Sequence, residues 1–398
     1  MANLLNKLRM LDAEPKKSPP KPTTVSKASS CYRSQAVFPL SIFTDRSHAR
    51  SDVLESIFGI AFPAHISPED ILFLDTETTG LSGGVGTIAF QIGVGYFSPS
   101  GFVVEQFLMH DYPEEAEMLR ILDALMQRFS VICTFNGRTF DVPLLKSRFL
   151  MNRIPNAHIP EIHADLLYPS RRMWKLRLKN CRLSNLEEQL LNVQRDDDLP
   201  GALVPQTYFQ YLKDGNFEPL LKILEHNKQD IVSLAQLFYF MCSQVDKPES
   251  IQNTEDLFSL AKAMEKQGQH DKAMRCYRMS TAGCMAAESY QAMARLEKRN
   301  GNCEAAVKLY QTMLSQGKDP AIACEALAKI FEHQLKDLPK AVSYTRQALL
   351  LLSEPTLFKN ESVQEQQKAL QYRYARLRRK LSNQTDKGGS SNGIVYHN

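Results

Sequence analysis

Residues 71–81 read ILFLDTETTGL, an apolar run that passes at once into two acids, Asp75 and Glu77. Apolar runs of this length are typical of buried strands, and alternate residues of a strand project from the same face. The two carboxylates are therefore expected to share one face at the end of the strand, where they repel each other unless a cation lies close by. We interpret the pair as part of a functional site; a plain surface pair is the alternative.

The flanking sequence predicts a meander of strands followed by alternating helices and strands. Glycine-containing turns separate the first β-rich runs, and the later segments switch between helical and strand periodicity. This order predicts a mixed sheet in an α/β layer. The expected strands are residues 71–74, 87–97, 102–109, 131–135 and 164–167, and the expected helices are residues 114–129, 142–150 and 220–241.

Two further acids follow expected elements of the same region. Asp141, in TFNGRTFDVP, comes after the strand at 131–135, at the start of a helix, and Asp230, in HNKQDIVSLAQLF, lies on the long helix. His226 precedes Asp230 by four residues. On a helix this spacing leaves two side chains about 40° apart, so both are expected to point into one site.

These three segments resemble the three exonuclease motifs of the DEDD superfamily of 3′→5′ exonucleases, over residues 71–241. The stretch HADLLYPSRRMWKLRLKNCRLSNLEEQL, with a repeat region behind it, further resembles the YprB-like branch of RNase H-like proteins. The resemblance implies an RNase H-like fold and two divalent cations, Mg²⁺ or Mn²⁺. The implied ligands of these cations are Asp75, Glu77, Asp141 and Asp230.

The chemistry of phosphodiester hydrolysis agrees with this implication. The substrate is an anion, and two cations about 3.5–4 Å apart offset the charge that develops and activate the attacking water. Ligands that are all oxygens favour Mg²⁺ or Mn²⁺ over zinc.

His226 departs from the family pattern. In the family a histidine base stands five residues before the last Asp, and a spacing of four belongs to the tyrosine subclass; here the histidine occupies the tyrosine position. We expect His226 to act as general base or water orienter, because imidazole titrates near neutrality. A capping or merely polar helix histidine is the alternative.

Residues 171–182 hold six Lys or Arg residues and Trp174, the only tryptophan. We expect this stretch to contact phosphates and Trp174 to stack on a base. A solvated helix face with Trp174 in the core is the alternative, and Asn136, a weaker candidate, could instead cap a turn. The expected nucleic-acid contacts are Thr76, Asn136, Arg171, Arg172, Trp174, Lys175 and Arg177.

Beyond residue 250 the chain contains an internal repeat. Gly268, Ala273 and Tyr277 recur 33 residues later as Gly301, Ala306 and Tyr310, and a degenerate third copy keeps only Ala341. This pattern resembles the tetratricopeptide repeat, and a plain helical bundle is the alternative. An all-α repeat domain is expected to bind a protein partner or to extend the substrate track.

Composition sets the remaining expectations. The 398 residues carry a net charge of +4, and both ends of the chain are basic. Eight dispersed cysteines without a CxxC pair indicate reduced thiols, and no apolar run approaches the roughly 18 residues of a membrane span, so a cytoplasmic location is expected. The expected domains are a disordered tether at 1–40, an RNase H-like domain at 41–245, a helical repeat domain at 250–382 and a disordered tail at 383–398.

Taken together, these features predict a metal-dependent nuclease that hydrolyses phosphodiester bonds of DNA or RNA, most simply as a 3′→5′ exonuclease on single-stranded or frayed ends. Two alternatives remain open. One is a binding or interaction scaffold with an inactive nuclease-like domain, and the other is a structure-specific endonuclease.

Overall fold

The computed structural model describes residues 31–80, 86–195, 199–353 and 361–389. The chain divides into two compact units, Met1–Ser250 and Ile251–Asn398. Most of the expected tether, residues 1–30, and the end of the expected tail, residues 390–398, lie outside the described residues. Within the described part, none of the helices is both long and apolar enough for a membrane span.

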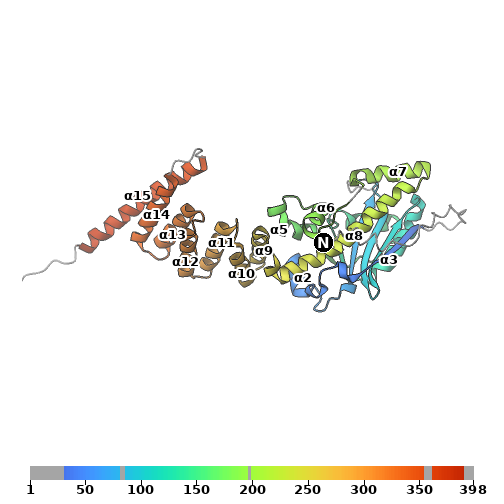
Figure 1. The fold of residues 1–398 in the computed structure, drawn as a ribbon, viewed down its shortest axis with the longest axis horizontal. Helices are drawn as coiled ribbons and strands as arrows, with labels where there is room; N and C mark the ends of the chain where they lie inside the picture. The colour runs from blue at the N-terminus through green and yellow to red at the C-terminus, as the bar shows by residue number, and fades with distance from the viewer. Residues whose placement is uncertain (1–30, 81–85, 196–198, 354–360, 390–398) are drawn as a thin grey trace, which may run out of the picture. The chain divides into compact units, whose positions relative to one another are not determined.

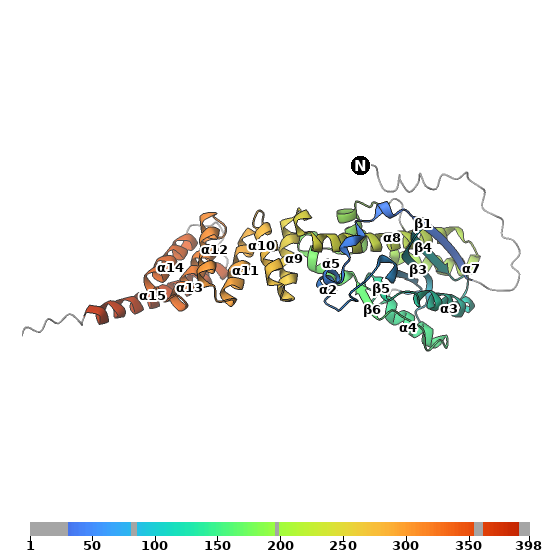
Figure 2. The same cartoon turned by 90° about the horizontal axis from the view of Figure 1, so that it is seen from below.

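The first unit is built on a six-stranded mixed sheet with the order β1-β4-β3-β2-β5-β6 (Figures 1 and 2). β2 pairs antiparallel with β3 and parallel with β5, so it lies between a meander and a parallel edge. The sheet, its flanking helices and the helical second unit confirm the expected fold class. The strands are β1 (Tyr32–Phe38), β2 (Ile71–Thr78), β3 (Ala89–Ser98), β4 (Gly101–Leu108), β5 (Val131–Thr134) and β6 (Ile162–Asp165).

Helices cover both faces of the sheet because alternate residues of its strands are apolar on both sides. Leu72 and Leu74 of β2 belong to a core that includes residues of α3 (Glu115–Met126) and α4 (Asp141–Met151). Phe73, between these leucines, faces the opposite way and meets Phe238 of α8 (Glu218–Asp246) edge-on at 5.7 Å between ring centroids. The remaining helices of this unit are α2 (Ser51–Phe58), α5 (Leu167–Leu178), α6 (Leu183–Leu186), the short π-helical segment η5 (Glu187–Leu191) and α7 (Val204–Asp214).

Two glycines of β3 let α8 lie close to the sheet. A Cβ atom at Gly93 would overlap the side-chain amide of Asn227, and one at Gly95 would overlap Ile231 and Phe102. Asn227 and Ile231 are one helical turn apart, so the same face of α8 rests on both glycines. This close approach brings His226 and Asp230 of α8 to the end of β2.

The expected tether at 1–40 is wrong in its last part, because residues 32–38 form β1 at the edge of the sheet. β1 pairs antiparallel with β4 from Tyr32 opposite Leu108 to Phe38 opposite Phe102. The exposure of its side chains alternates along YRSQAVF, the period-two pattern of a half-covered strand. The residues just before this stretch are rich in proline and lysine, and for this reason the predicted tether extends over the strand.

The second unit consists of helices connected in sequence. They are α9 (Thr254–Lys266), α10 (His270–Ser280), α11 (Ala286–Arg299), α12 (Cys303–Ser315), α13 (Pro320–His333), α14 (Leu338–Ser353) and α15 (Glu361–Gly389). α15 continues past residue 382, which corrects the start of the expected disordered tail at 383.

Helical pairs explain the 33-residue period of the second unit. Gly268 and Gly301, with φ of 77° and 83°, lie between α9 and α10 and between α11 and α12, in the left-handed conformation that favours glycine. Ala273 and Ala306, one on each second helix, are completely buried. Small side chains at these positions allow neighbouring helices to pack closely.

We expect Gly93→Ala to lower the free energy of unfolding by about 1–3 kcal/mol, because the added methyl group must displace Asn227 from its place on the sheet. The measurement is urea unfolding of the full-length protein. The matched control is Gly201→Ala, since no atom lies within 4 Å of a Cβ at that position. Equal stability of the two variants would contradict the tight seating of α8.

Candidate active site

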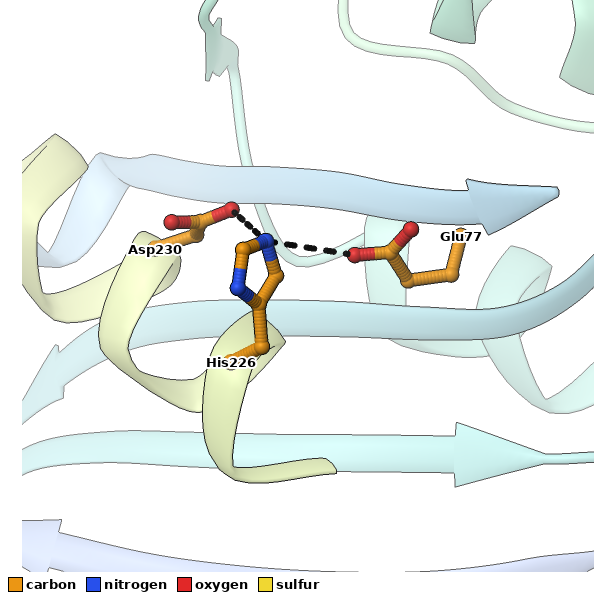
Figure 3. Close-up of side chains that lie close together, drawn as sticks. All are labelled: Glu77, His226 and Asp230. Carbon is orange, nitrogen blue, oxygen red and sulfur yellow. Dashed lines mark ion pairs between the residues drawn. The ribbon is translucent and has the colours of Figure 1, made fainter. Parts of the chain in front are cut away.

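Glu77, His226 and Asp230 converge at the end of β2. One possible ligand atom from each of the three lies within 4.8 Å of the others. His226 Nε2 is 3.4 Å from Asp230 Oδ2 and 3.9 Å from Glu77 Oε1. Figure 3 shows the imidazole ring of His226 standing between the two carboxylates. The strand and the helix therefore bring Glu77, His226 and Asp230 to one point.

Asn227 ties α8 to the sheet beside this cluster. Asp75, Gly93 and Gln106 are neighbours in one row across β2, β3 and β4. The Asn227 amide nitrogen donates to Asp75 Oδ2 at 2.9 Å, and its Oδ1 accepts from Gln106 Nε2 at 3.0 Å. Gln106 Nε2 also donates to the carbonyl of Leu224, at 2.7 Å. Asn227 is completely buried, so these hydrogen bonds replace the water that its amide has lost.

Sequence reasoning missed Asn227 and Gln106. The available signals were a glycine in the middle of the apolar run QIGVG and a glutamine in the strand FVVEQFL. A glycine inside a strand often marks a close approach of another group.

Asp141 begins α4, at the carboxyl end of β5 as expected. The Thr76 hydroxyl donates to Asp141 Oδ1 at 2.5 Å, and both residues are buried. Thr76 is an expected phosphate contact, and in this structure its hydroxyl is directed at a carboxylate. Asp141 is not a member of the cluster of Glu77, His226 and Asp230 within 4.8 Å.

Burial raises the pKa values of two acids of the site. Burial raises the pKa of Asp75 well above its usual range, and the charges of Asp230, Asp141 and Glu77 raise it further, against the hydrogen bond from Asn227. Burial raises the pKa of Asp141 to about 6, although the Thr76 hydroxyl opposes the shift. Such shifts mean that ionising these two carboxyl groups costs free energy in the folded protein.

Arg195 is a site residue that sequence reasoning did not find. Its guanidinium forms a fork with Glu187, Nε to Oε2 at 2.7 Å and Nη2 to Oε1 at 2.6 Å, and Nη2 also donates to Asp230 Oδ1. Glu187 of η5 is almost completely buried. Burial alone would lower the pKa of Arg195, but the charges of Asp230 and Glu187 raise it. The side chain is therefore a fixed cation beside Asp230.

Arg195 also sets the hydrogen bonding of His226. Its Nη1 lies 3.2 Å from His226 Nδ1. A guanidinium can only donate, so Nδ1 accepts and the proton of the neutral ring is on Nε2, facing Asp230 and Glu77. In this arrangement Nδ1 accepts a hydrogen bond from Arg195, and Nε2–H is a donor that faces the two carboxylates. The ring therefore acts as a hydrogen-bond donor toward the site and not as a base.

The donor set fits a divalent cation. Oxygen atoms of Glu77, at the end of β2, and of Asp230, on α8, lie close together beside His226, and the charges of Asp230, Asp141 and Glu77 add to the burial that raises the pKa of Asp75. The guanidinium of Arg195 forms ion pairs with Asp230 and Glu187. A cation that binds Asp230 has to share this carboxylate with Arg195 or displace it.

The expected nucleic-acid contacts lie in different environments. Trp174 is 1% exposed and lies over Phe240 at 6.2 Å between ring centroids, so its ring is in the core, as in the alternative, and cannot stack on a base here. Asn136 has a φ of 69°, its backbone N–H donates to Asp165 and its Oδ1 accepts from Thr139, which agrees with a turn cap. The remaining candidates are on α5, with Arg171, Arg172 and Lys175 exposed and Arg177 partly exposed.

His163 and Asp165 have structural partners. His163 Nε2 lies 2.8 Å from the Thr134 hydroxyl, and Asp165 accepts backbone N–H groups from Asn136, Arg138 and Leu167 at 2.9, 3.0 and 3.0 Å. Asp165 thereby ties the start of α5 to the loop that leads into α4.

Comparisons with known proteins agree with this geometry. Residues 72–242 match the model of the RNase_H superfamily. The chain is 29% identical over 322 residues to the "Uncharacterized protein YprB" of Bacillus subtilis (strain 168), an alignment that covers 79% of this chain and 75% of that protein. The expected RNase H-like domain and the likeness to YprB are thus confirmed.

Among solved structures, the chain is similar to the family B DNA polymerase from the hyperthermophilic archaeon Pyrobaculum calidifontis. The match has 13% sequence identity and a TM-score of 0.36, and it covers 52% of this chain. The matched part is 30% of the polymerase chain.

Raising the pH from 5 to 7 is expected to destabilise the metal-free protein. Because the folded pKa values of Asp75 and Asp141 are raised, the folded state binds more protons than the unfolded chain between about pH 4 and pH 6, and their stabilising contribution is lost as the pH rises through the folded pKa. Over the same pH change, the free energy of unfolding of Asp141→Asn should fall by about 1–3 kcal/mol less than that of the wild type. The measurement is chemical unfolding with a chelator present at each pH.

Parallel pH profiles for the wild type and Asp141→Asn would contradict the assigned cause. Addition of Mn²⁺ to the wild type at pH 7 should restore stability, because a bound cation offsets the same charges.

Proposed function

We propose that this protein is a metal-dependent nuclease that hydrolyses phosphodiester bonds, acting as a 3′→5′ exonuclease on single-stranded or frayed ends. The convergence of Glu77, His226 and Asp230 at the end of β2, with Asp75 and Asp141 beside them, is the observation that carries the proposal. An RNase H-like domain supports a hydrolase of this class in general.

Asp75, Glu77, Asp141 and Asp230 would hold two divalent cations, Mg²⁺ or Mn²⁺. Bound there, the cations would offset the charge of the phosphodiester and lower the pKa of the attacking water. Thr76 keeps Asp141 oriented through its hydroxyl, and Asn227 does the same for Asp75. A carboxylate held in one orientation loses less conformational freedom when it takes up a ligand.

His226 serves in this proposal as an orienting donor. Its Nε2–H faces the space between Glu77 and Asp230, and Arg195 covers Nδ1. The ring can therefore donate to an oxygen of the water or the phosphate and hold it for in-line attack. Arg195 in turn is proposed to keep Asp230 and His226 in place through its fork with Glu187.

The second unit is proposed to be a tetratricopeptide-like repeat domain that binds a protein partner. The recurrence of Gly268, Ala273 and Tyr277 at a shift of 33 residues, on two helical pairs, supports this assignment.

Asp75→Asn is expected to reduce degradation of end-labelled oligonucleotides by about a hundredfold or more, because the site loses a charge that the cations require. The side chain keeps an acceptor for Asn227, so the fold should be preserved. The assay uses full-length protein with Mn²⁺ and with Mg²⁺, on DNA and RNA labelled at either end. Asp214→Asn, at an exposed position outside the site, is the matched control.

The products separate the alternatives. Stepwise shortening of a 5′-labelled strand supports the proposed polarity, whereas cutting of closed circular single strands would indicate an endonuclease. If no labelled substrate is degraded, the inactive binding scaffold is favoured. In that scaffold the guanidinium of Arg195 would take the place of a metal ion beside Asp230.

His226→Gln and His226→Ala distinguish the two roles of the histidine. An orienting donor predicts that Gln, which keeps an N–H group, retains activity within about tenfold of the wild type while Ala loses about a hundredfold. The readout is kcat as a function of pH. If both variants are equally impaired and the acidic limb of the profile disappears in both, His226 is the general base.

A further inference from the structure

A hollow of about 380 Å³ in the first unit has a lining that is rich in arginine. It is formed by the end of α2, the loop between β5 and α4, and the first turns of α5, which lie beside one another in Figure 2. The volume is in the range of ligand pockets, about 300–1,000 Å³. The residues of interest in its lining are Phe58, Arg138, Asp165, Tyr168, Arg171 and Arg172.

The charge of the hollow is not compensated. Within the described part of the chain, Arg138, Arg171 and Arg172 form no ion pair with a carboxylate. The one acid in the lining, Asp165, is buried and accepts three backbone N–H groups. Three guanidinium groups around one hollow therefore present a net positive charge to an incoming anion.

Two of the three arginines are also held in position. Arg138 Nη2 donates to the His163 carbonyl at 3.2 Å, and Arg172 Nη2 donates to the Ile57 carbonyl. Desolvation lowers the pKa of Arg172. Neutral carbonyl partners fix the side chains without cancelling their charge, so their remaining N–H groups can bind phosphate oxygens.

The hollow is linked to the active site through the backbone. Asp165 binds the N–H groups of Asn136 and Arg138, and three residues after Arg138 the chain reaches Asp141. Three residues span at most about 11 Å. A strand whose end lies at Asp141 can therefore reach the hollow within a few nucleotides.

An aromatic ring completes the lining. Tyr168 is 43% exposed, and Phe58 lies on the opposite element. An exposed ring beside cationic groups is the usual platform for an unpaired base. A base in a duplex is already stacked and paired, so only a single strand can place one in this hollow.

We propose that this hollow binds one nucleotide of a single-stranded nucleic acid, with the phosphate at Arg138 and Arg171 and the base against Tyr168. The inference rests on the proposed nuclease function and specifies its substrate. Among the basic residues of α5 that the sequence predicts as phosphate contacts, Arg171 and Arg172 line the hollow, whereas Lys175 does not. Arg138, from a different element, is added.

The test measures binding of fluorescein-labelled oligo(dT) and oligo(rU) to the full-length protein by fluorescence anisotropy, with a chelator present to prevent turnover. Arg138→Gln/Arg171→Gln should weaken binding at least about tenfold and reduce the slope of log K against log salt by about 1.4, or about 0.7 for each lost phosphate contact. Arg120→Gln/Arg153→Gln removes two exposed arginines outside the hollow and should leave both quantities unchanged.

Tyr168 gives an independent readout. Tyr168→Leu should weaken binding by about fivefold to a hundredfold, and Tyr168→Phe, which keeps the ring, should bind like the wild type. A blunt duplex of the same length should bind more weakly than the single strand. Equal losses in the two double arginine variants, or equal binding of duplex and single strand, would overturn the inference.

The outcomes also separate this inference from the proposed function. If the wild type degrades nucleic acid and the hollow variants bind like the wild type, only the assignment of the hollow fails. If the wild type neither binds nor degrades any of the oligonucleotides, the proposed function fails as well.

Discussion

The contact of Asn227 with the row formed by Asp75, Gly93 and Gln106 sets the geometry of the whole site. The amide side chain fills the space left by the missing Cβ of Gly93 and hydrogen-bonds to both neighbours in the row. Because α8 is rigid, this single anchor determines where His226 and Asp230 lie, one residue before and three residues after it. Ile231 on Gly95 provides the second point of contact that prevents rotation of the helix.

Burial of two acids is the main cost of this arrangement. Burial raises the pKa of both Asp75 and Asp141, and the charges of Asp230, Asp141 and Glu77 raise that of Asp75 further. Hydrogen bonds from Asn227 and Thr76 oppose the two pKa shifts, and Arg195 forms ion pairs with Asp230 and Glu187. A divalent cation bound as proposed would offset the remaining negative charge.

The basic residues of α15, near the end of the chain, bind an acid of the second unit. Glu332 of α13, almost completely buried, accepts hydrogen bonds from Arg373, Arg376 and Lys380 of α15. These charges lower the pKa of Glu332, although burial opposes the shift. Part of the positive charge near the end of the chain therefore holds α15 in the second unit. Arg138 and Arg172 of the hollow beside α5, in contrast, donate to backbone carbonyls.

The sequence by itself determined the class of the fold and the positions of most strands and helices, because these depend on periodicity within single elements. The acids Asp75, Glu77, Asp141 and Asp230 were predicted from the resemblance of their segments to exonuclease motifs. The sequence also predicted that His226 and Asp230 share a helix face. Only the tertiary structure revealed Asn227, Arg195 and Arg138, placed Trp174 in the core and showed that residues 32–38 complete the sheet. The reason is physical: each of these roles arises from contacts between residues far apart in the chain, and local patterns carry no information about such partners.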